Sequence, residues 1–366
     1  MFRSAGTWIL AGSVLLAASP VLAGKQNSPR VAMLEQDGWA AIKDGKPAAA
    51  ADLFREAITL DPKNASLRLG AATAAFQQRR DAEAKAYAEQ ALALEPRSAM
   101  ARVLLAQVSR RQGDLAEAIR LYEMVAADVP GDDAVRETLD RWKRERDLHD
   151  RMLTTVGNFF TVQFEGAADA AMAAQALESL NRAYWRITDV FGVIPQRSIP
   201  VVLYSGAQFE DITRSPKWAA AAFDGIIRVP MAGANEQGED LDRVLAHEFT
   251  HALIRSLATR GLPAWLNEGL ASVLERDSLD WAAQRIVHVE APTLAMLTAP
   301  FGKLSGAEAQ IAYAASALAA RRLLDEAGGP AIANLLRDLG DGVAFEDAFA
   351  HRVQKSLADF EATLKK

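Results

Sequence analysis

The stretch HEFTH at residues 247–251 contains two of the chain's five histidines, four positions apart, with Glu248 between them. On an α-helix, residues four apart differ by about 40° in direction and about 6 Å in rise, so both imidazoles can reach one metal ion. Glu248 lies about 100° around from His247, beside such an ion, where its carboxylate can reach a metal-bound water. The stretch therefore predicts a metal site with an adjacent base. The alternative is a pair of core histidines that form hydrogen bonds within a helix.

The residues around HEFTH predict the helix that would carry it. Acidic residues gather at Glu239, Asp240 and Asp242, which suits a helix N-terminus. Gly261 and Pro263 mark the other end. The motif thus falls in the middle of a helix.

A third metal ligand is expected from LPAWLNEGLASVLERD at residues 262–277. Pro263 can open a helix there, and Gly269 would allow another helix to approach closely. The two helices form a helix–turn–helix pair that brings Glu268 back toward His247 and His251. Two histidines and a glutamate are a ligand set of catalytic zinc, with one position left for water. Glu275 is interpreted as a surface charge, the alternative being that it orients a ligand.

HEFTH followed by WLNEGLAS resembles the gluzincin peptidases, in which a glutamate is the third zinc ligand. The resemblance covers residues 154–366 and implies one Zn²⁺ per chain, bound by His247, His251 and Glu268, with Glu248 as general base. The segment WLNEG is similar to that of the aminopeptidase branch. However, His251 and Glu268 are closer in sequence than in that branch, and its G-x-M-E-N segment is missing. The sequence therefore does not predict an aminopeptidase, and either an endopeptidase or a narrow exopeptidase with other substrate anchors remains open.

The resemblance also implies an oxyanion donor, a tyrosine or histidine that follows the third ligand. The residues of those types after Glu268 are His288, Tyr313 and His351. Tyr313 is favoured because small residues surround it in AEAQIAYAASALAARRLL, which would let that helix pack close to the site. The alternatives are a core tyrosine with a satisfied hydroxyl, and His288 as the donor.

The elements that must position these residues predict an α+β domain of zincin type at residues 154–366. Residues 158–166 alternate in polarity like a strand, and a long helix then ends at Gly192. A strand at 199–205, a short helix and a strand at 225–231 follow. Pro230 in the last strand favours the edge of the sheet.

The preceding part of the chain repeats with a period of 34 residues. Three similar segments each end in a proline: LFREAITLDP at Pro62, YAEQALALEP at Pro96 and YEMVAADVP at Pro130. Small residues recur in phase with them, and Gly45 and Gly113 mark turns whose middle counterpart is Arg79. Residues 31–132 therefore resemble three tetratricopeptide repeats, an all-α solenoid. The concave face of this array is expected to bind a peptide or protein. The alternatives are that the array is a spacer, or that its surface packs on the next domain. Small peptidase-MA-like domains are found beside such repeats.

The remaining segments complete the expected organisation. Residues 133–153 predict a capping and linking helix in which His149 is a solvated surface residue. Residues 1–23 predict a cleaved signal peptide, with an uncleaved anchor as the alternative. The chain would then be periplasmic or secreted, with no stable membrane span after cleavage. The chain has no cysteine and a net charge of −6, so we expect neither disulfides nor nucleic acid as a partner.

The sequence alone thus favours an exported zinc-dependent peptidase whose repeats bind a partner or substrate. Two other functions stay open. One is a non-catalytic tetratricopeptide adaptor with an inactive zincin domain. The other is a zinc-dependent hydrolase that acts on a non-peptide bond.

Overall fold

The computed structural model describes residues 28–166, 169–213, 222–223, 225–230, 238–276, 278–289 and 291–364. The predicted signal peptide at residues 1–23 lies outside the described residues. The chain divides into two compact units, with the boundary between Leu148 and His149. Each unit is described by itself.

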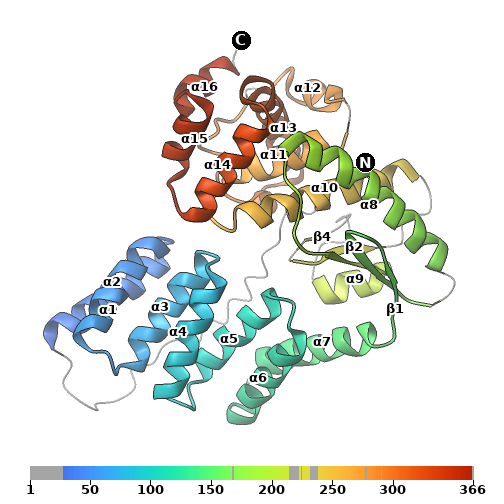
Figure 1. Cartoon of the computed structure of the whole chain (residues 1–366). Helices are drawn as coiled ribbons and strands as arrows, with labels where there is room; N and C mark the ends of the chain where they lie inside the picture. The colour runs from blue at the N-terminus through green and yellow to red at the C-terminus, as the bar shows by residue number, and fades with distance from the viewer. Residues whose placement is uncertain are drawn as a thin grey trace. The chain divides into compact units, whose positions relative to one another are not determined.

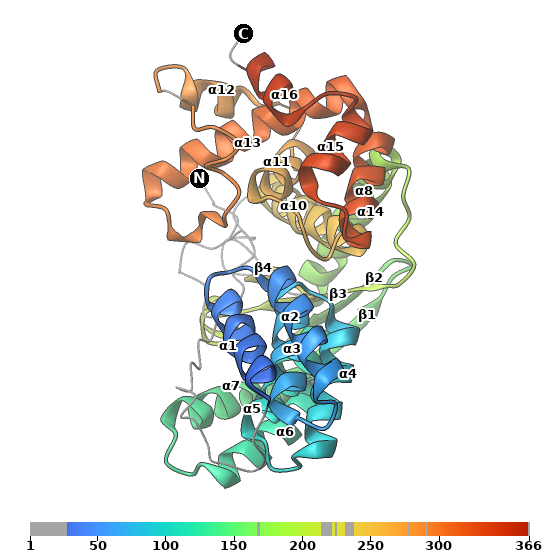
Figure 2. The same cartoon turned by 90° about the vertical axis from the view of Figure 1, so that its left-hand side faces the viewer.

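The first unit consists of antiparallel helix pairs followed by a seventh helix (Figures 1 and 2). The bounds of its helices are α1 Pro29–Lys43, α2 Pro47–Leu60, α3 Ala65–Gln77, α4 Asp81–Leu94, α5 Ala99–Arg111, α6 Leu115–Asp128 and α7 Asp133–His149. Each predicted repeat therefore corresponds to one helix pair, and each predicted proline follows the second helix of its pair.

The positions that recur every 34 residues have the same structural role in each repeat. The predicted turn residues Gly45, Arg79 and Gly113 all adopt left-handed backbone angles, with φ of 72°, 60° and 86°. Arg79 does so although it carries a Cβ, which makes this conformation costly for a residue other than glycine. The recurring alanines are fully buried where paired helices meet. They are Ala50, Ala84 and Ala118 in the second helices and Ala72 and Ala106 in the first helices.

Helix α7 covers the end of the repeat unit through one apolar face. Trp142 is buried there against the ring of Tyr122, with ring centroids 4.5 Å apart. Glu145 of α7 forms a buried ion pair with Arg110 of α5 at 2.8 Å. Helix α7 thus buries both apolar surface and charge, and it ends at His149, four residues before the predicted end of the capping helix at residue 153.

The second unit contains a five-stranded mixed sheet in the order β1-β2-β3-β5-β4. The strands are β1 Leu153–Val156, β2 Phe160–Phe164, β3 Ile199–Tyr204, β4 Ala222–Phe223 and β5 Ile227–Pro230. Strands β2, β3 and β5 run parallel, whereas β1 and β4 are antiparallel to their neighbours.

The prediction of an edge strand at residues 225–231 was wrong. Strand β5 lies between β3 and β4, because the two-residue strand β4 pairs Ala222 with Arg228 and Phe223 with Ile227. A proline is tolerated in β5 because Pro230 is its last residue.

Two helices pack on one face of this sheet and contribute buried residues to its core. Helix α8 Ala170–Phe191 ends at Gly192, whose φ of 63° stops the helix as the sequence predicted. Helix α10 Gly238–Leu257 packs beside α8 and contacts β4 and β5 (Figure 1). The short helix α9 Gly206–Thr213 contacts β3 and β5. The long helix that carries HEFTH therefore rests directly on the sheet.

The remaining helices build the layer beyond α10. They are α11 Ala264–Leu274, α12 Asp280–Ile286, α13 Gly306–Ala327, α14 Gly329–Asp341, α15 Phe345–Val353 and α16 Leu357–Thr363, with a 3₁₀ turn η2 at Phe301–Lys303. Helix α11 packs against both α10 and α13. Across the described part of the chain, no helix has the length and apolar character needed to cross a membrane.

Candidate metal centre

Helix α10 holds the HEFTH motif in its middle, as the flanking residues predicted. Leu245, Phe249 and Leu253 are fully buried in the core of the unit, which fixes the rotation of the helix. Thr250 is buried too, and its hydroxyl donates to the backbone carbonyl of Ala246 at 2.8 Å. The rings of His247 and His251 lie side by side, with centroids 4.7 Å apart.

Helix α11 presents Glu268 to these two rings. Its N-terminus is anchored by two backbone hydrogen bonds, from Ala264 to Thr298 and from Trp265 to Leu297. Such bonds satisfy amides that a helix start otherwise leaves without partners. Gly261, with φ of 71°, belongs to the short connection from α10. The helix–turn–helix pair predicted from the sequence is therefore formed.

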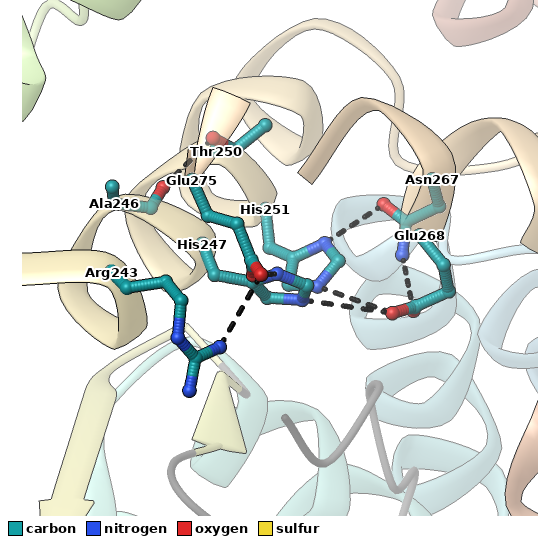
Figure 3. A network of polar contacts seen from close by, with 8 residues as sticks. All are labelled: Arg243, Ala246, His247, Thr250, His251, Asn267, Glu268 and Glu275. Carbon is teal, nitrogen blue, oxygen red and sulfur yellow. Dashed lines mark hydrogen bonds and ion pairs between the residues drawn. The ribbon is translucent and has the colours of Figure 1, made fainter. Parts of the chain in front are cut away.

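The three predicted ligands come together as one buried group (Figure 3). The Nε2 atoms of His247 and His251 each lie 3.7 Å from Oε2 of Glu268. A tetrahedral zinc ion with bonds of about 2.0–2.1 Å holds its ligand atoms about 3.4 Å apart. His251 Nε2 and Glu268 Oε2 are buried without a hydrogen-bond partner. Their spacing and these unsatisfied atoms fit a metal ion.

Glu275 holds His247 from the side away from Glu268. Its Oε2 lies 2.6 Å from His247 Nδ1, and its Oε1 accepts from Arg243 at 3.3 Å (Figure 3). The carboxylate is almost completely buried, with 7% of the side chain exposed. The interpretation of Glu275 as a surface charge was therefore wrong: it ends α11 where the chain passes beside α10.

Asn267 contacts the other two members of the group, His251 and Glu268. Its Oδ1 lies 3.2 Å from His251 Nδ1, and its amide nitrogen donates to Glu268 Oε1 at 3.1 Å. Neither Asn267 nor Arg243 was singled out from the sequence. The available signals were that Asn267 directly precedes Glu268 and that Arg243 lies one helical turn before His247.

The neighbouring carboxylates favour the protonated form of His247. Burial acts to lower the pKa of His247, but the carboxylates of Glu268 and Glu275 outweigh it and raise this pKa to about 10. Burial lowers the pKa of His251 to about 4. Burial acts to raise the pKa of Glu268, yet the neighbouring histidines hold it below its ordinary value. At neutral pH the carboxylates are thus ionised, and His247 must lose its proton before it can bind a metal.

Glu248 is not a member of the group of His247, His251 and Glu268, but it interacts electrostatically with His247, Glu268 and Glu275. It is completely buried, and neither of its carboxylate oxygens has a hydrogen-bond partner. Burial raises its pKa to about 8, against the opposing effect of charged His247. A carboxylate whose pKa is close to neutral pH has the property that a general base requires.

The three candidates for an oxyanion donor differ in their surroundings. Tyr313 lies on α13, half-buried, with its ring edge-on to Phe301 at 5.2 Å between centroids. His288 and His351 are both exposed to solvent. The small residues flanking Tyr313 are buried, and α13 packs on the ligand helix α11, as expected.

His149, expected to be a solvated surface residue, is half-buried. Its Nε2 lies 2.6 Å from the hydroxyl of the buried Tyr204. This contact could not be predicted from the sequence because Tyr204 lies 55 residues further along the chain.

Comparison with known proteins supports the predicted repeats. Two tetratricopeptide-repeat family models match, one at residues 41–87 and the other at residues 82–133. No family model of a zincin domain matches, and no curated protein matches the chain. Residues 41–133 are thus tetratricopeptide repeats, which suggests that this part binds protein.

Solved structures that are similar to this chain are tetratricopeptide domains. The first such domain of Spaghetti (RPAP3), bound to the HSP90 peptide SRMEEVD, is 24% identical and has a TM-score of 0.31; the match covers 32% of this chain and 94% of that one. The Sgt2 domain from Aspergillus fumigatus is 22% identical with a TM-score of 0.33, and the match covers 40% of this chain and 99% of that one. Likeness at this level adds no argument about function.

Proposed function

We propose that this chain is a zinc-dependent peptidase of gluzincin type. The observation that carries the proposal is the buried group of His247, His251 and Glu268, with the unpaired carboxylate of Glu248 beside it. The donor set of two imidazoles and one carboxylate is that of catalytic zinc, which keeps one position open. A purely structural zinc site would have four protein ligands and no need of a neighbouring base.

The residues of the chain divide the chemistry among them. A bound zinc ion would supply Lewis acidity, which polarises a carbonyl oxygen and lowers the pKa of a bound water molecule to near neutral pH. Glu248 accepts the proton of the attacking water on its carboxylate and passes it to the leaving nitrogen. Glu275 and Asn267 orient the imidazoles of His247 and His251 through their Nδ1 atoms. The hydroxyl of Tyr313 is assigned to the developing oxyanion.

The tetratricopeptide repeats are the proposed binding site for a protein. Tetratricopeptide arrays present an extended concave surface, and we assign to it a protein substrate or a partner that delivers one. We further propose that residues 1–23 direct the chain to the periplasm or the exterior. No nucleic acid is part of this proposal, because the chain is acidic.

A second candidate function is that of a non-catalytic adaptor. It is favoured by the repeats, which suggest protein binding whether or not the second unit is active. An adaptor would have no use for an unpaired buried glutamate at Glu248, whose desolvation is costly. The two candidate functions differ because only the peptidase requires the metal group to support hydrolysis of peptide bonds.

The deciding experiment measures metal content and hydrolysis together. Purified mature protein should hold about one zinc per chain and cleave an unfolded protein substrate, and a chelator should abolish cleavage until zinc is restored. His251→Ala and Glu268→Ala should lose most of the zinc. Unchanged zinc content in both variants would remove the basis of the proposal. Full zinc content without hydrolysis of peptide bonds would favour the adaptor, or a hydrolase of another bond.

A further inference from the structure

Helices α11 and α13 touch backbone to backbone at the residue next to the metal ligand Glu268. A Cβ atom built on Gly269 would lie 2.3 Å from the carbonyl oxygen of Ser316, 2.8 Å from its carbonyl carbon and 2.9 Å from Cβ of Ala320. The first contact involves main chain and not the end of a flexible side chain. The obstacle therefore cannot move without moving a turn of α13.

We infer that Gly269 is a positioning residue, which sets how close Glu268 approaches His247 and His251. This inference rests on the proposed metal site and assigns to α13 the function of a rigid support for the ligand helix. It concerns the placement of a ligand, so Gly269 itself contacts neither metal nor substrate.

The distance by which a methyl group at Gly269 displaces α11 determines its effect on metal binding. Real Cβ atoms essentially never lie within 3.0 Å of another heavy atom, so a methyl group at Gly269 requires the two backbones to move apart by at least about 0.7 Å. Metal sites tolerate deviations of only about 0.2 Å in the distance to each ligand. A shift of the Glu268 backbone several times larger than that tolerance must weaken metal binding.

Both sides of the contact are held in place, so neither can absorb the shift freely. The N-terminus of α11 is fixed by the backbone bonds to Leu297 and Thr298. The N-terminus of α13 is closed by a capping box between Ser305 and Glu308. The facing surface of α13 is fully buried at Ser316 and Ala320. An added methyl group therefore separates the helices at the point where Glu268 is attached.

The unit contains a matched control for the loss of packing. Gly329, at the start of α14, would place a Cβ only 1.8 Å from the carbonyl oxygen of Val190 on α8. Neither α8 nor α14 carries a metal ligand. Gly329→Ala thus introduces at least as severe a backbone contact, but between two helices that supply no member of the group of His247, His251 and Glu268.

The test compares Gly269→Ala, Gly329→Ala and the wild-type full-length chain. Zinc affinity is measured by competition with a chelator, and the absorption spectrum of the Co²⁺-substituted protein reports the geometry of the ligands. Gly269→Ala should bind zinc on the order of tenfold to a hundredfold more weakly, with an altered Co²⁺ spectrum. Gly329→Ala should lower the melting temperature while its zinc affinity and Co²⁺ spectrum stay those of the wild type.

Each other outcome contradicts the inference or the proposal beneath it. Wild-type affinity and spectrum in folded Gly269→Ala would overturn the inference, as would an equal loss of affinity in both variants. If Gly269→Ala does not fold, Ala320→Val adds bulk at the same contact from the α13 side and must show the same loss of affinity. A wild-type chain that takes up no metal would instead overturn the proposed metal site itself.

Discussion

Glu275 Oε2 lies 2.6 Å from His247 Nδ1, on the opposite side of the imidazole from the predicted metal position. The hydrogen bond directs Nε2 of His247 toward Glu268 and the predicted metal position, and the negative charge of Glu275 makes the imidazole a stronger electron donor to a metal ion. The equivalent partner of His251 is the neutral amide oxygen of Asn267. The two histidines are thus electronically different ligands.

Replacing Glu275 by glutamine should weaken zinc binding by about tenfold to a hundredfold, because an acceptor is kept while its charge is lost. The zinc dissociation constant, measured against a chelator of known affinity, checks this prediction. Glu346→Gln, which removes an exposed carboxylate on α15, is the matched control and should leave the constant unchanged. Equal constants for the two variants would show that Glu275 does not act on the metal site.

Arg243 should affect metal binding only through Glu275, which its guanidinium contacts at 3.3 Å. Arg243→Gln should weaken zinc binding less than Glu275→Gln, because Arg276 also lies 3.4 Å from the Glu275 carboxylate. In the double variant the second substitution should add little to the loss, since neighbours in one network are not additive. Fully additive losses in this cycle would separate Arg243 from the network.

Metal binding should release protons and should strengthen as pH rises. In the metal-free protein the pKa of His247 is raised to about 10, so this ligand is protonated at neutral pH and must lose its proton to bind. Between pH 6 and pH 8 the apparent zinc affinity should therefore increase about tenfold for each unit of pH. Calorimetry at pH 7 in two buffers of different ionisation enthalpy should find at least one proton released. A zinc affinity that does not vary with pH would contradict the prediction.

The sequence predicted that His247, His251 and Glu268 would come together, because helix periodicity places the two histidines on one face and a short turn brings the next helix back beside them. It also predicted the 34-residue repeat, since proline, glycine and alanine recur where helices end, turn and touch. It could not predict the partner of Glu275, because that contact depends on how the end of α11 meets an earlier turn of α10. Strand β4 was missed as well, because two residues are too few to show alternation, and with it the interior position of β5.

Replacing Glu248 by glutamine should leave zinc content unchanged and lower hydrolysis by orders of magnitude. The amide has nearly the same shape but cannot accept the proton of the attacking water. Glu248 takes no part in the group formed by His247, His251 and Glu268, so the metal should be retained. Zinc content and turnover are measured on the same preparation. Near-normal hydrolysis would show that the base lies elsewhere.

The hydroxyl of Tyr313 is the group to test for a role in oxyanion stabilisation. Tyr313→Phe removes one oxygen and keeps the ring that packs edge-on against Phe301, so folding should be unaffected. If the hydroxyl donates to the oxyanion, kcat should fall by about 10²–10³, the usual loss for one such donor, while zinc content stays the same. His288→Ala and His351→Ala are the controls, because both histidines are exposed and should leave kcat unchanged. Normal turnover in Tyr313→Phe together with a loss in His288→Ala would transfer the role to His288. Normal turnover in all three variants would mean that oxyanion stabilisation comes from the metal and another donor.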